Sequence, residues 1–432
     1  MEPSVIEEVR LASFKSFRKA ALPLEDFTLL VGRNGSGKSN ALDGLWVLSR
    51  LAHGTDIRDA IEGGREAPTV RGGVVGCAPF GESSFSLGCT VRTGYQVVKL
   101  DVTIRVEPSI QVVMERLKIQ GKTVLRTWAP TEGLGDIEAR WANGKPGPDP
   151  SVMFRSSQLL CTQVLARLPA TEAGQAIHLA AARVLAALRS VFVLDPVPHQ
   201  MRQYVPRKDV RLRRDAEKLS AAIASLVEFP ATKDTLRMAL GALNEQHISD
   251  IGVSSSDLDD VMLTLNEGDA GHPVSARVMS DGSLRFLAIL VALMQSPTID
   301  TMPEALASED AIGQTTVVIE ELENGLHASQ AATLVELIRE QVRQRRVRAL
   351  ATGHSPALLD ALTGDEHRNV VVCQRDAGGQ SSLTRLVELP EYFNIVAAGT
   401  LGKAAVHDRL RSAAAGAHAS SFLDELLGGT VG

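Results

Sequence analysis

The stretch FTLLVGRNGSGKSNALDGL (residues 27–45) decides the fold, because its parts predict a strand, a tight loop and a helix in direct succession. Residues 27–31 form a short apolar run of the kind expected for a buried strand. After the glycine-rich turn, apolar residues recur at helical spacing through residue 52. Residues 32–39 fit the full pattern G-x-x-x-x-G-K-[S/T] between these elements, so the loop is predicted to bind phosphate.

The residue types of this loop follow from phosphate chemistry. Glycines let backbone N–H groups turn inward around phosphate oxygens, and the helix N-terminus adds the positive end of its dipole. Lys38 would supply a mobile positive charge to the β- and γ-phosphates, and Ser39 a hydroxyl ligand for Mg²⁺. ATP and Mg²⁺ are therefore the predicted cofactors. The predicted nucleotide-binding residues here are Arg33, Asn34, Gly35, Ser36, Gly37, Lys38, Ser39 and Asn40.

A second candidate site is TTVVIEELENGLH (residues 315–327), in which a β-branched strand ends abruptly in acidic residues. Ligands of open α/β sheets bind beyond the carboxyl ends of the strands. We expect Glu320 to hold Mg²⁺, directly or through water, and Glu321 to orient or deprotonate an attacking water. Taken alone, two exposed acids at a strand end would explain the pattern equally simply.

A third stretch, ATGHSP (residues 351–356), follows a short strand predicted over residues 348–352. His354 stands at the carboxyl end of that strand, where an imidazole can donate a hydrogen bond to a γ-phosphate. We therefore expect Lys38, Glu321 and His354 to be the catalytic residues. A purely structural histidine is the alternative, and Ser355–Pro356 reads as an ordinary helix start.

The stretch MSDGSLRFLAIL (residues 279–290) places a Ser-Asp-Gly-Ser tetrad in front of an apolar helix. Ser280 and Asp281 are good N-cap residues, so a helix cap would explain the tetrad locally. A serine hydroxyl, a glycine amide and a helix N-terminus also form an anion site. Ser280 and Gly282 are thus added to the candidate nucleotide-binding residues.

The remaining pattern predicts an α/β chain with an antiparallel region and a helical insertion. Residues 98–106 alternate as a half-buried antiparallel strand does, and ANGKPGPDPS (residues 142–151) then indicates a lobe boundary. Residues 151–244 read as helical, and strands return at 261–265 and 274–278. The predicted domains are a first lobe (1–145), a mainly helical insertion (146–260), a second lobe (261–390) and a C-terminal tail (391–432).

Composition and charge limit the classes of protein. With 432 residues and 44% hydrophobic content, the chain can bury a large core, and its longest apolar run is far too short to cross a membrane. The acidic N-terminus does not resemble a secretory signal, so a cytoplasmic protein without a membrane partner is expected. The four cysteines are scattered without a C-x-x-C pair, which favours buried, reduced thiols.

The net charge of −6 gives no overall attraction to nucleic acid, so any such contact must be local. A solvated helix face is the simpler interpretation of both basic clusters, although the first could track phosphates. The clusters comprise Arg202, Arg207, Lys208, Arg211, Arg213 and Arg214, and then Arg343, Arg345, Arg346 and Arg348.

The order of these motifs resembles the ABC-type ATPase head, specifically the bacterial group related to SMC, RecF and OLD proteins. In that comparison, residues 32–39 are the Walker A motif, 279–290 occupy the place of the signature, 319–327 are Walker B with its D-loop, and 351–356 are the switch-histidine loop. The resemblance implies a two-lobed P-loop NTPase head with a mixed sheet, an antiparallel β-lobe and a helical insertion. It also implies that two heads sandwich ATP, with Ser280 and Gly282 of one touching the nucleotide of the other.

The sequence departs from the group at several positions. Glu320 stands where Asp is usual, Leu322 replaces proline, and Asp281 and Ser283 replace the Gly and Gln of a transporter signature. The Q-loop glutamine is not fixed by the sequence. Gln158 and Gln163 are candidates for it, and Phe14, Lys15 and Arg18 are candidates to approach the base or ribose, with core packing the alternative for Phe14.

The resemblance favours an ATP-hydrolysing switch, a homodimer or higher homo-oligomer, that controls a separately encoded effector in anti-phage or toxin–antitoxin defence. No acidic pair typical of a Toprim nuclease follows residue 356, so no nuclease activity is expected. A RecF-like, DNA-binding repair ATPase is the alternative function. A transporter ATPase subunit is disfavoured by the signature sequence.

Overall fold

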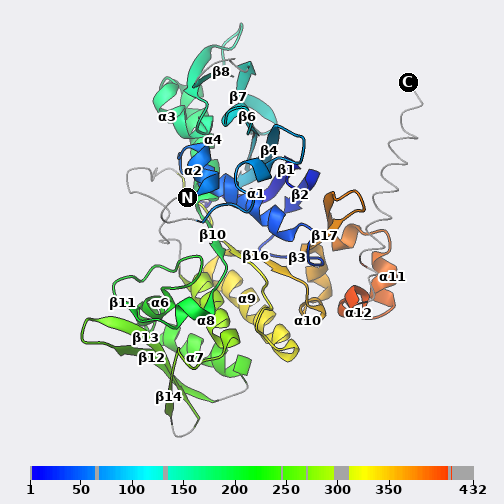
Figure 1. Ribbon diagram of the computed structural model, residues 1–432. Coiled ribbons are helices and arrows are strands. Elements are labelled where there is room, and N and C mark those ends of the chain that lie inside the picture. The colour runs from blue at the N-terminus through cyan, green and yellow to red at the C-terminus, as the bar shows by residue number, and fades with distance from the viewer. Residues whose placement is uncertain are drawn as a thin grey trace.

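The computed structural model describes residues 2–63, 68–129, 135–244, 247–268, 271–295, 311–406 and 410. Within them lie a long antiparallel sheet, a central, mostly parallel sheet and a small antiparallel sheet. Figure 1 shows the antiparallel lobe at the top, the central sheet in the middle and the small sheet with its helices at the lower left. The predicted mixed α/β, two-lobed architecture is confirmed.

The antiparallel lobe is a sheet in the order β2-β1-β4-β5-β6-β7-β8-β9. The alternation predicted over residues 98–106 lies in β5, where the apolar residues from Val98 to Ile104 are buried. The strands are β1 (Val5–Phe14), β2 (Phe17–Pro23), β4 (Ser84–Thr93), β5 (Gln96–Arg105), β6 (Gln111–Ile119), β7 (Lys122–Ala129), β8 (Asp136–Trp141) and β9 (Ser151–Arg155).

This sheet continues past the expected lobe boundary. The proline- and glycine-rich residues 142–150 connect β8 to β9, which pair antiparallel with Ile137 opposite Phe154. A hairpin connection and an interdomain linker use the same turn-forming residues, so composition alone did not separate them. The break expected at residue 145 is a loop inside the sheet.

The central sheet has the order β10-β15-β16-β3-β17-β18, in which only β18 runs antiparallel to its neighbour. The predicted strands at 27–31, 316–319 and 348–352 are therefore adjacent and parallel, and their carboxyl ends meet at one edge. The strands are β3 (Phe27–Val31), β10 (Val191–Leu194), β15 (Thr316–Ile319), β16 (Arg348–Gly353), β17 (Val370–Arg375) and β18 (Ser381–Arg385).

The two faces of the central sheet bury different helices. Leu30 shares a core with α1 (Lys38–Leu51) and α4 (Glu172–Arg189), and this core continues into the antiparallel lobe. Leu29 points to the other face, into a core with α8 (Asp281–Met294) and α9 (Ala331–Arg345). The helix that follows the phosphate loop and the helix that follows the Ser-Asp-Gly-Ser tetrad thus lie on opposite faces.

The segment predicted as a helical insertion divides between these faces. Its helix α4 packs in the core of the first face, whereas α6 (Leu219–Leu226) and α7 (Pro230–Asn244) pack in the core of the second. It also contains strands, because β10 belongs to the central sheet and β12 (Ile248–Ser255) to the small one. The small sheet is completed by β11 (Val205–Pro206), β13 (Asp260–Glu267) and β14 (His272–Ser275), the last two of which correspond to the predicted returning strands.

The remaining helices are short. They are α2 (Ile57–Glu62), α3 (Val164–Arg167), α5 (Pro198–Met201), α10 (Pro356–Asp360), α11 (Tyr392–Ala397) and α12 (Leu401–Val406), together with 3-10 turns. All four cysteines are buried and free, as expected. Among the described residues, no helix is both long and apolar enough to span a bilayer.

Candidate nucleotide-binding site

The phosphate loop leaves β3 at Val31 and enters α1 at Lys38, so the strand, loop and helix lie where the sequence predicts them. Two of its glycines are required by close contacts. A Cβ at Gly32 would lie 2.3 Å from the carbonyl oxygen of Cys373, and one at Gly37 would lie 2.4 Å from Ser381 Oγ. Gly37 also has a φ of +114°, which side chains rarely permit.

Lys38 folds back over its own loop. Its Nζ donates to the carbonyl of Gly32 at 2.5 Å and to that of Arg33 at 3.0 Å. Burial lowers the pKa of Lys38, and nearby Cys373, Glu323 and Glu321 offset only part of that effect. The ammonium therefore lies within electrostatic reach of the acidic D-loop, although those acids follow a different strand.

Buried polar residues beneath the loop hold its backbone. The Ser381 hydroxyl, on β18, donates to the carbonyl of Ser36 at 2.7 Å and lies 2.8 Å from Ser16 Oγ. Asn40, predicted to contact nucleotide, donates its amide to Ser16 Oγ at 2.8 Å. Its side chain thus extends the polar network that supports the loop.

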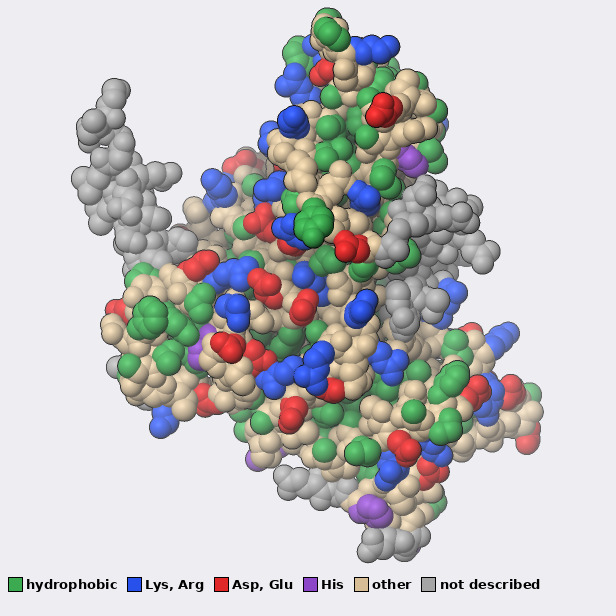
Figure 2. Space-filling view, turned by 180° about the vertical axis from the view of Figure 1, so that it is seen from behind, with side chains coloured by type: hydrophobic (Ala, Val, Ile, Leu, Met, Phe, Trp, Pro, Cys, Tyr) green, Lys and Arg blue, Asp and Glu red, His purple; other side chains and the backbone are tan. Residues whose placement is uncertain are grey.

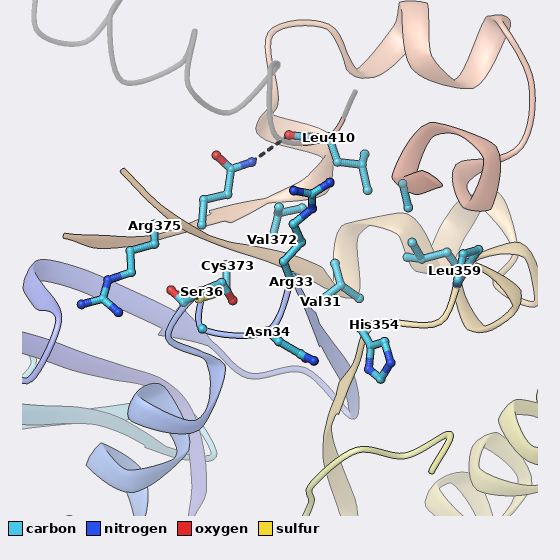
Figure 3. Close-up of a pocket in the computed structure, with 15 residues that line it drawn as sticks. Val31, Arg33, Asn34, Ser36, His354, Leu359, Val372, Cys373, Arg375 and Leu410 are labelled. Atoms are coloured by element: carbon cyan, nitrogen blue, oxygen red, sulfur yellow. Dashed lines mark hydrogen bonds between the residues drawn. The ribbon is translucent and has the colours of Figure 1, made fainter. Parts of the chain in front are cut away.

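The loop borders a cavity of 620 Å³ (Figure 3). Arg33, Asn34 and His354 line it, and the apolar side chains of Leu359 and Leu410 lie on the far side from Ser36. A volume of this size falls in the range typical of small-molecule sites. The predicted phosphate loop and the predicted switch histidine therefore line one cavity.

The two adjacent glutamates at the end of β15 have different surroundings. Glu320 is 9% exposed, and both of its carboxylate oxygens accept from arginines, Arg71 at 2.7 Å and Arg214 at 3.1 Å. Glu321 is exposed and adopts a φ of +51°, an uncommon conformation for a residue with a side chain. The Thr352 hydroxyl, on β16, accepts from its backbone N–H at 2.9 Å.

His354 is held by a D-loop carboxylate. Glu323 Oε1 accepts from the backbone N–H groups of His354 and of Ser355, the latter at 2.7 Å, and lies 3.0 Å from His354 Nδ1. The imidazole is about half exposed, so its Nδ1 edge faces Glu323 while the ring borders the cavity. The switch-histidine loop and the D-loop are therefore directly connected.

The tetrad at residues 280–283 forms a helix cap in this structure. Ser280 Oγ accepts from the backbone N–H of Ser283 at 3.0 Å, and the Asp281 carboxylate pairs with Arg202 at 2.6 Å. The helix start also packs against the D-loop, because a Cβ at Gly282 would lie 2.2 Å from the carbonyl oxygen of Gly325. The tetrad thus contacts the D-loop of its own chain.

The other candidates are engaged with different partners in this structure. Gln158 donates to the carbonyl of Gly54, beyond the far end of α1, and Gln163 bonds the backbone of Arg155. Phe14 is fully buried against Phe85, so it belongs to the core. Lys15 pairs with Asp43 and Arg18 with Glu82.

The predicted basic clusters are largely consumed by local ion pairs. Arg202, Arg207, Arg213 and Arg214 pair with carboxylates, and Arg348 is buried against the backbone carbonyls of Ile6 and Leu24. On the face seen in Figure 2, basic and acidic side chains are interspersed. These ion pairs support the simpler interpretation of the first cluster, and its phosphate-tracking role stays a prediction.

Sequence reasoning did not identify Arg71, Arg214, Glu323 or Ser381 as site residues. Glu323 could have been found, because it lies in the same acidic stretch as Glu321. Arg71 and Ser381 carry no local signal, since one lies in a glycine-rich turn and the other on an edge strand. Only the tertiary structure brings Arg71 to Glu320 and Ser381 to the loop.

Comparison with known proteins gives the following similarities. Residues 27–129 and 186–360 match the family described as "AAA domain, putative AbiEii toxin, Type IV TA system". A segment of 49 residues is 51% identical to the chromosome partition protein Smc of Methanococcus voltae, covering 11% of this chain and 4% of that protein. This chain therefore matches only a small part of that relative.

Several solved structures are similar to this chain at low sequence identity. An Smc head bound to the C-winged helix domain of ScpA has 14% identity and a TM-score of 0.47, covering 88% of this chain and 97% of that one. The Smc head with an extended coiled coil bound to the C-terminal domain of ScpA, from Pyrococcus furiosus, has 13% identity and a TM-score of 0.46, covering 91% of this chain and 99% of that one. The recombination mediator protein RecF has 13% identity and a TM-score of 0.37, covering 88% of this chain and 98% of that one. The family match spans most of the chain and includes the Walker A and Walker B stretches, so the chain belongs to this AAA-domain family.

Proposed function

We propose that this chain is an ATP-hydrolysing switch that dimerises around ATP and controls a separately encoded effector in bacterial anti-phage or toxin–antitoxin defence. One observation carries the proposal. The phosphate loop, Glu321 and His354 meet at the carboxyl edge of three adjacent parallel strands, while the tetrad helix lies on the other face of the sheet from α1.

The residues at this edge suit phosphoryl transfer to water. The loop amides and Lys38 would bind the β- and γ-phosphates, and His354 would donate to the γ-phosphate. Glu321 is exposed, and among the described residues no arginine pairs with it, so it would orient the attacking water or accept its proton. The Glu323 contact would hold the imidazole in place.

The residue types suit a hard divalent cation, although both Glu320 oxygens accept from arginines in this structure. The Ser39 hydroxyl and the Glu320 carboxylate are oxygen ligands of the kind Mg²⁺ prefers, and the nucleotide phosphates would complete the set. Within the described part of the chain, no group of three or more His, Cys, Asp or Glu side chains is arranged as a metal site on its own. When bound, Mg²⁺ would neutralise charge on the phosphates.

The positions of α1 and α8 support pairing of two heads. These helices pack on opposite faces of one sheet, so we do not expect Ser280 to reach Lys38 of its own chain. A second copy would complete each nucleotide site with the first copy's Ser280 and Gly282. The Ser280 cap leaves the amide of Gly282 at the helix start, where an anion is favoured.

The family description supports the defence context, and the charge distribution disfavours the DNA-repair alternative. The description of the matched family names a putative AbiEii toxin of a type IV toxin–antitoxin system. A RecF-like clamp needs a basic surface for duplex phosphates, yet Arg207 and Arg213 are already paired with acids. Purification together with the product of the neighbouring gene, followed by host survival under phage attack, tests the context.

The Glu321→Gln variant tests the catalytic proposal. It should bind ATP and accumulate as a dimer in analytical ultracentrifugation, with phosphate release reduced at least a hundredfold, because the water loses its base. Glu336→Gln, the same change at an exposed position of α9, is the matched control and should hydrolyse ATP normally. Full turnover by Glu321→Gln would refute the assignment, and a monomer in ATP would refute the pairing.

A further inference from the structure

Glu320 is the meeting point of two arginines from distant parts of the chain. Arg71 Nη2 lies 2.7 Å from Oε2, and Arg214 Nη2 lies 3.1 Å from Oε1. The Glu320 side chain is 10% exposed, so its charge is stabilised mainly by these two guanidinium groups rather than by water. The predicted metal ligand therefore has both oxygens engaged.

The two arginines are held very differently. Arg214 is 20% exposed, stacks 4.0 Å from the Trp46 ring centroid and lies 3.7 Å from Asp195. Arg71 is 47% exposed, and within the described part of the chain no aromatic ring stacks on it. Of the two, Arg71 has the smaller energetic reason to stay on Glu320.

Arg71 also has a second carboxylate within reach. Its Nη1 lies 3.9 Å from Asp43, a residue that is 2% exposed and already pairs with Lys15 at 2.5 Å. Lys15 also donates to the backbone carbonyl of Arg71 at 2.8 Å. The backbone of Arg71 is thus held in place, and its side chain can move from Glu320 to Asp43 without moving the loop.

Asp43 connects this exchange to the phosphate loop. It lies one helical turn after Ser39 on α1, so the two side chains share a face of that helix. Arg71 therefore bridges the helix that carries the Ser39 hydroxyl and the strand end that carries Glu320. The side chains expected to receive the cation are linked through an arginine.

We propose that Arg71 controls access of the divalent cation to Glu320: it occupies the Glu320 carboxylate in the nucleotide-free head and moves to Asp43 when the metal–nucleotide complex binds. Arg214 stays on Glu320 throughout and keeps the carboxylate oriented. This rests on the ATP site proposed above. A guanidinium and a divalent cation repel one another, so they compete for one oxygen, and each weakens the binding of the other.

The experiment measures cation affinity directly. Mn²⁺ binding to the ADP-loaded protein is followed by electron paramagnetic resonance, and ADP affinity is measured separately in EDTA. Arg71→Ala should bind Mn²⁺ about three- to fivefold more tightly, the effect of removing a half-exposed ion pair. Its ADP affinity in EDTA should match that of the wild type, because the cradle is untouched. Arg71→Lys, which keeps the charge, should change Mn²⁺ affinity less.

Two controls separate competition from a general change. Arg92→Ala removes an arginine of 48% exposure that also pairs with a glutamate, Glu7, and it should leave Mn²⁺ affinity unchanged. In a Glu320→Gln background, the gain from Arg71→Ala should disappear, because the shared oxygen has lost its charge. Unchanged or weaker Mn²⁺ binding by Arg71→Ala would overturn the proposal while leaving the ATP site intact. If the wild-type protein binds ADP neither in EDTA nor with metal, the proposed ATP site is wrong, and this proposal fails with it.

Discussion

Replacing Glu323 with alanine removes the acceptor for two backbone N–H groups and the partner of one imidazole nitrogen. The amides of His354 and Ser355 and the imidazole Nδ1 all contact Glu323 Oε1. The side chain is only 12% exposed, so water can replace it only in part. Losing acceptors for two such donors costs about 1–3 kcal/mol each when they are fully buried. Partial solvation of this loop places the total near 2 kcal/mol.

A cost of about 2 kcal/mol corresponds to roughly thirtyfold more frequent opening of the loop. Hydrogen exchange followed by mass spectrometry should show this acceleration in the peptide that contains residues 353–356. ATP turnover should fall about tenfold or more, because the imidazole loses its orientation, while ATP affinity changes little. Loss of turnover without faster exchange would show that Glu323 acts in some other way.

Glu366→Ala is the matched control for this prediction. Glu366 accepts from the backbone N–H of Thr363 at 2.8 Å and pairs with Arg339 at 2.6 Å, so it supports a nearby loop in the same manner. Exchange should accelerate at residue 363, and turnover should stay at the wild-type level. Equal loss of turnover in both variants would refute the reasoning, because it would make loop support, rather than His354, the cause.

Three further predictions follow from contacts described above and from one buried acid. Gly282→Ala should weaken ATP-driven pairing more than tenfold in analytical ultracentrifugation and leave ADP binding unchanged. The reason is that the new Cβ would lie 2.2 Å from the Gly325 carbonyl oxygen, and such overpacking costs about 1–3 kcal/mol. An unaltered dimer dissociation constant would contradict this. Ser381→Ala should raise the calorimetric Kd for ATP about fivefold, the value of one hydrogen bond of about 1 kcal/mol to the Ser36 carbonyl, and an unchanged Kd would count against it. Burial raises the pKa of Glu115 above its ordinary 4.5, although backbone N–H groups of residues 160 and 161 partly oppose this. The folded state therefore holds this proton more tightly than the unfolded state, and stability falls as pH rises from 4.5 through the raised pKa. Glu115→Gln should flatten that fall in urea midpoints, and an identical pH profile would exclude Glu115 as its source.

The central part of the site was predictable because its signals are local in sequence. The loop at residues 32–39, the acidic end of β15 and His354 each follow a strand, and parallel strands bring their carboxyl ends to one edge. The family match covers all of these motif stretches. The assigned catalytic roles stay predictions until the variants are measured.

The parts that were not predicted depend on tertiary contacts. Arg71 reaches Glu320 across 249 positions, and Ser381 reaches Ser36 across 345. No periodicity in the sequence carries such pairings. For the same reason, the basic cluster near Arg207 looked continuous along the chain, although the fold distributes its members among separate carboxylates.

The helical insertion was misjudged for a different physical reason. Alanine- and leucine-rich helices such as α4 and α6 look alike in sequence, yet they pack into cores on opposite faces of the central sheet. Strand β12 lies in the same range and was missed, because the apolar residues of its sequence, ISDIGVSS, do not alternate regularly. Helix propensity identified the elements but not the surface that each one covers.

Trp46 is an intrinsic fluorescent probe close to the arginine that pairs with Glu320. Two guanidinium groups lie near its ring centroid, that of Arg214 at 4.0 Å and that of Arg50 at 5.5 Å, and Arg214 also pairs with Glu320. The other two tryptophans, Trp128 and Trp141, both lie in the antiparallel sheet, and replacing them with phenylalanine would leave one emitter. Emission from that single indole would then report, in real time and without a label, each change of charge beside the end of β15.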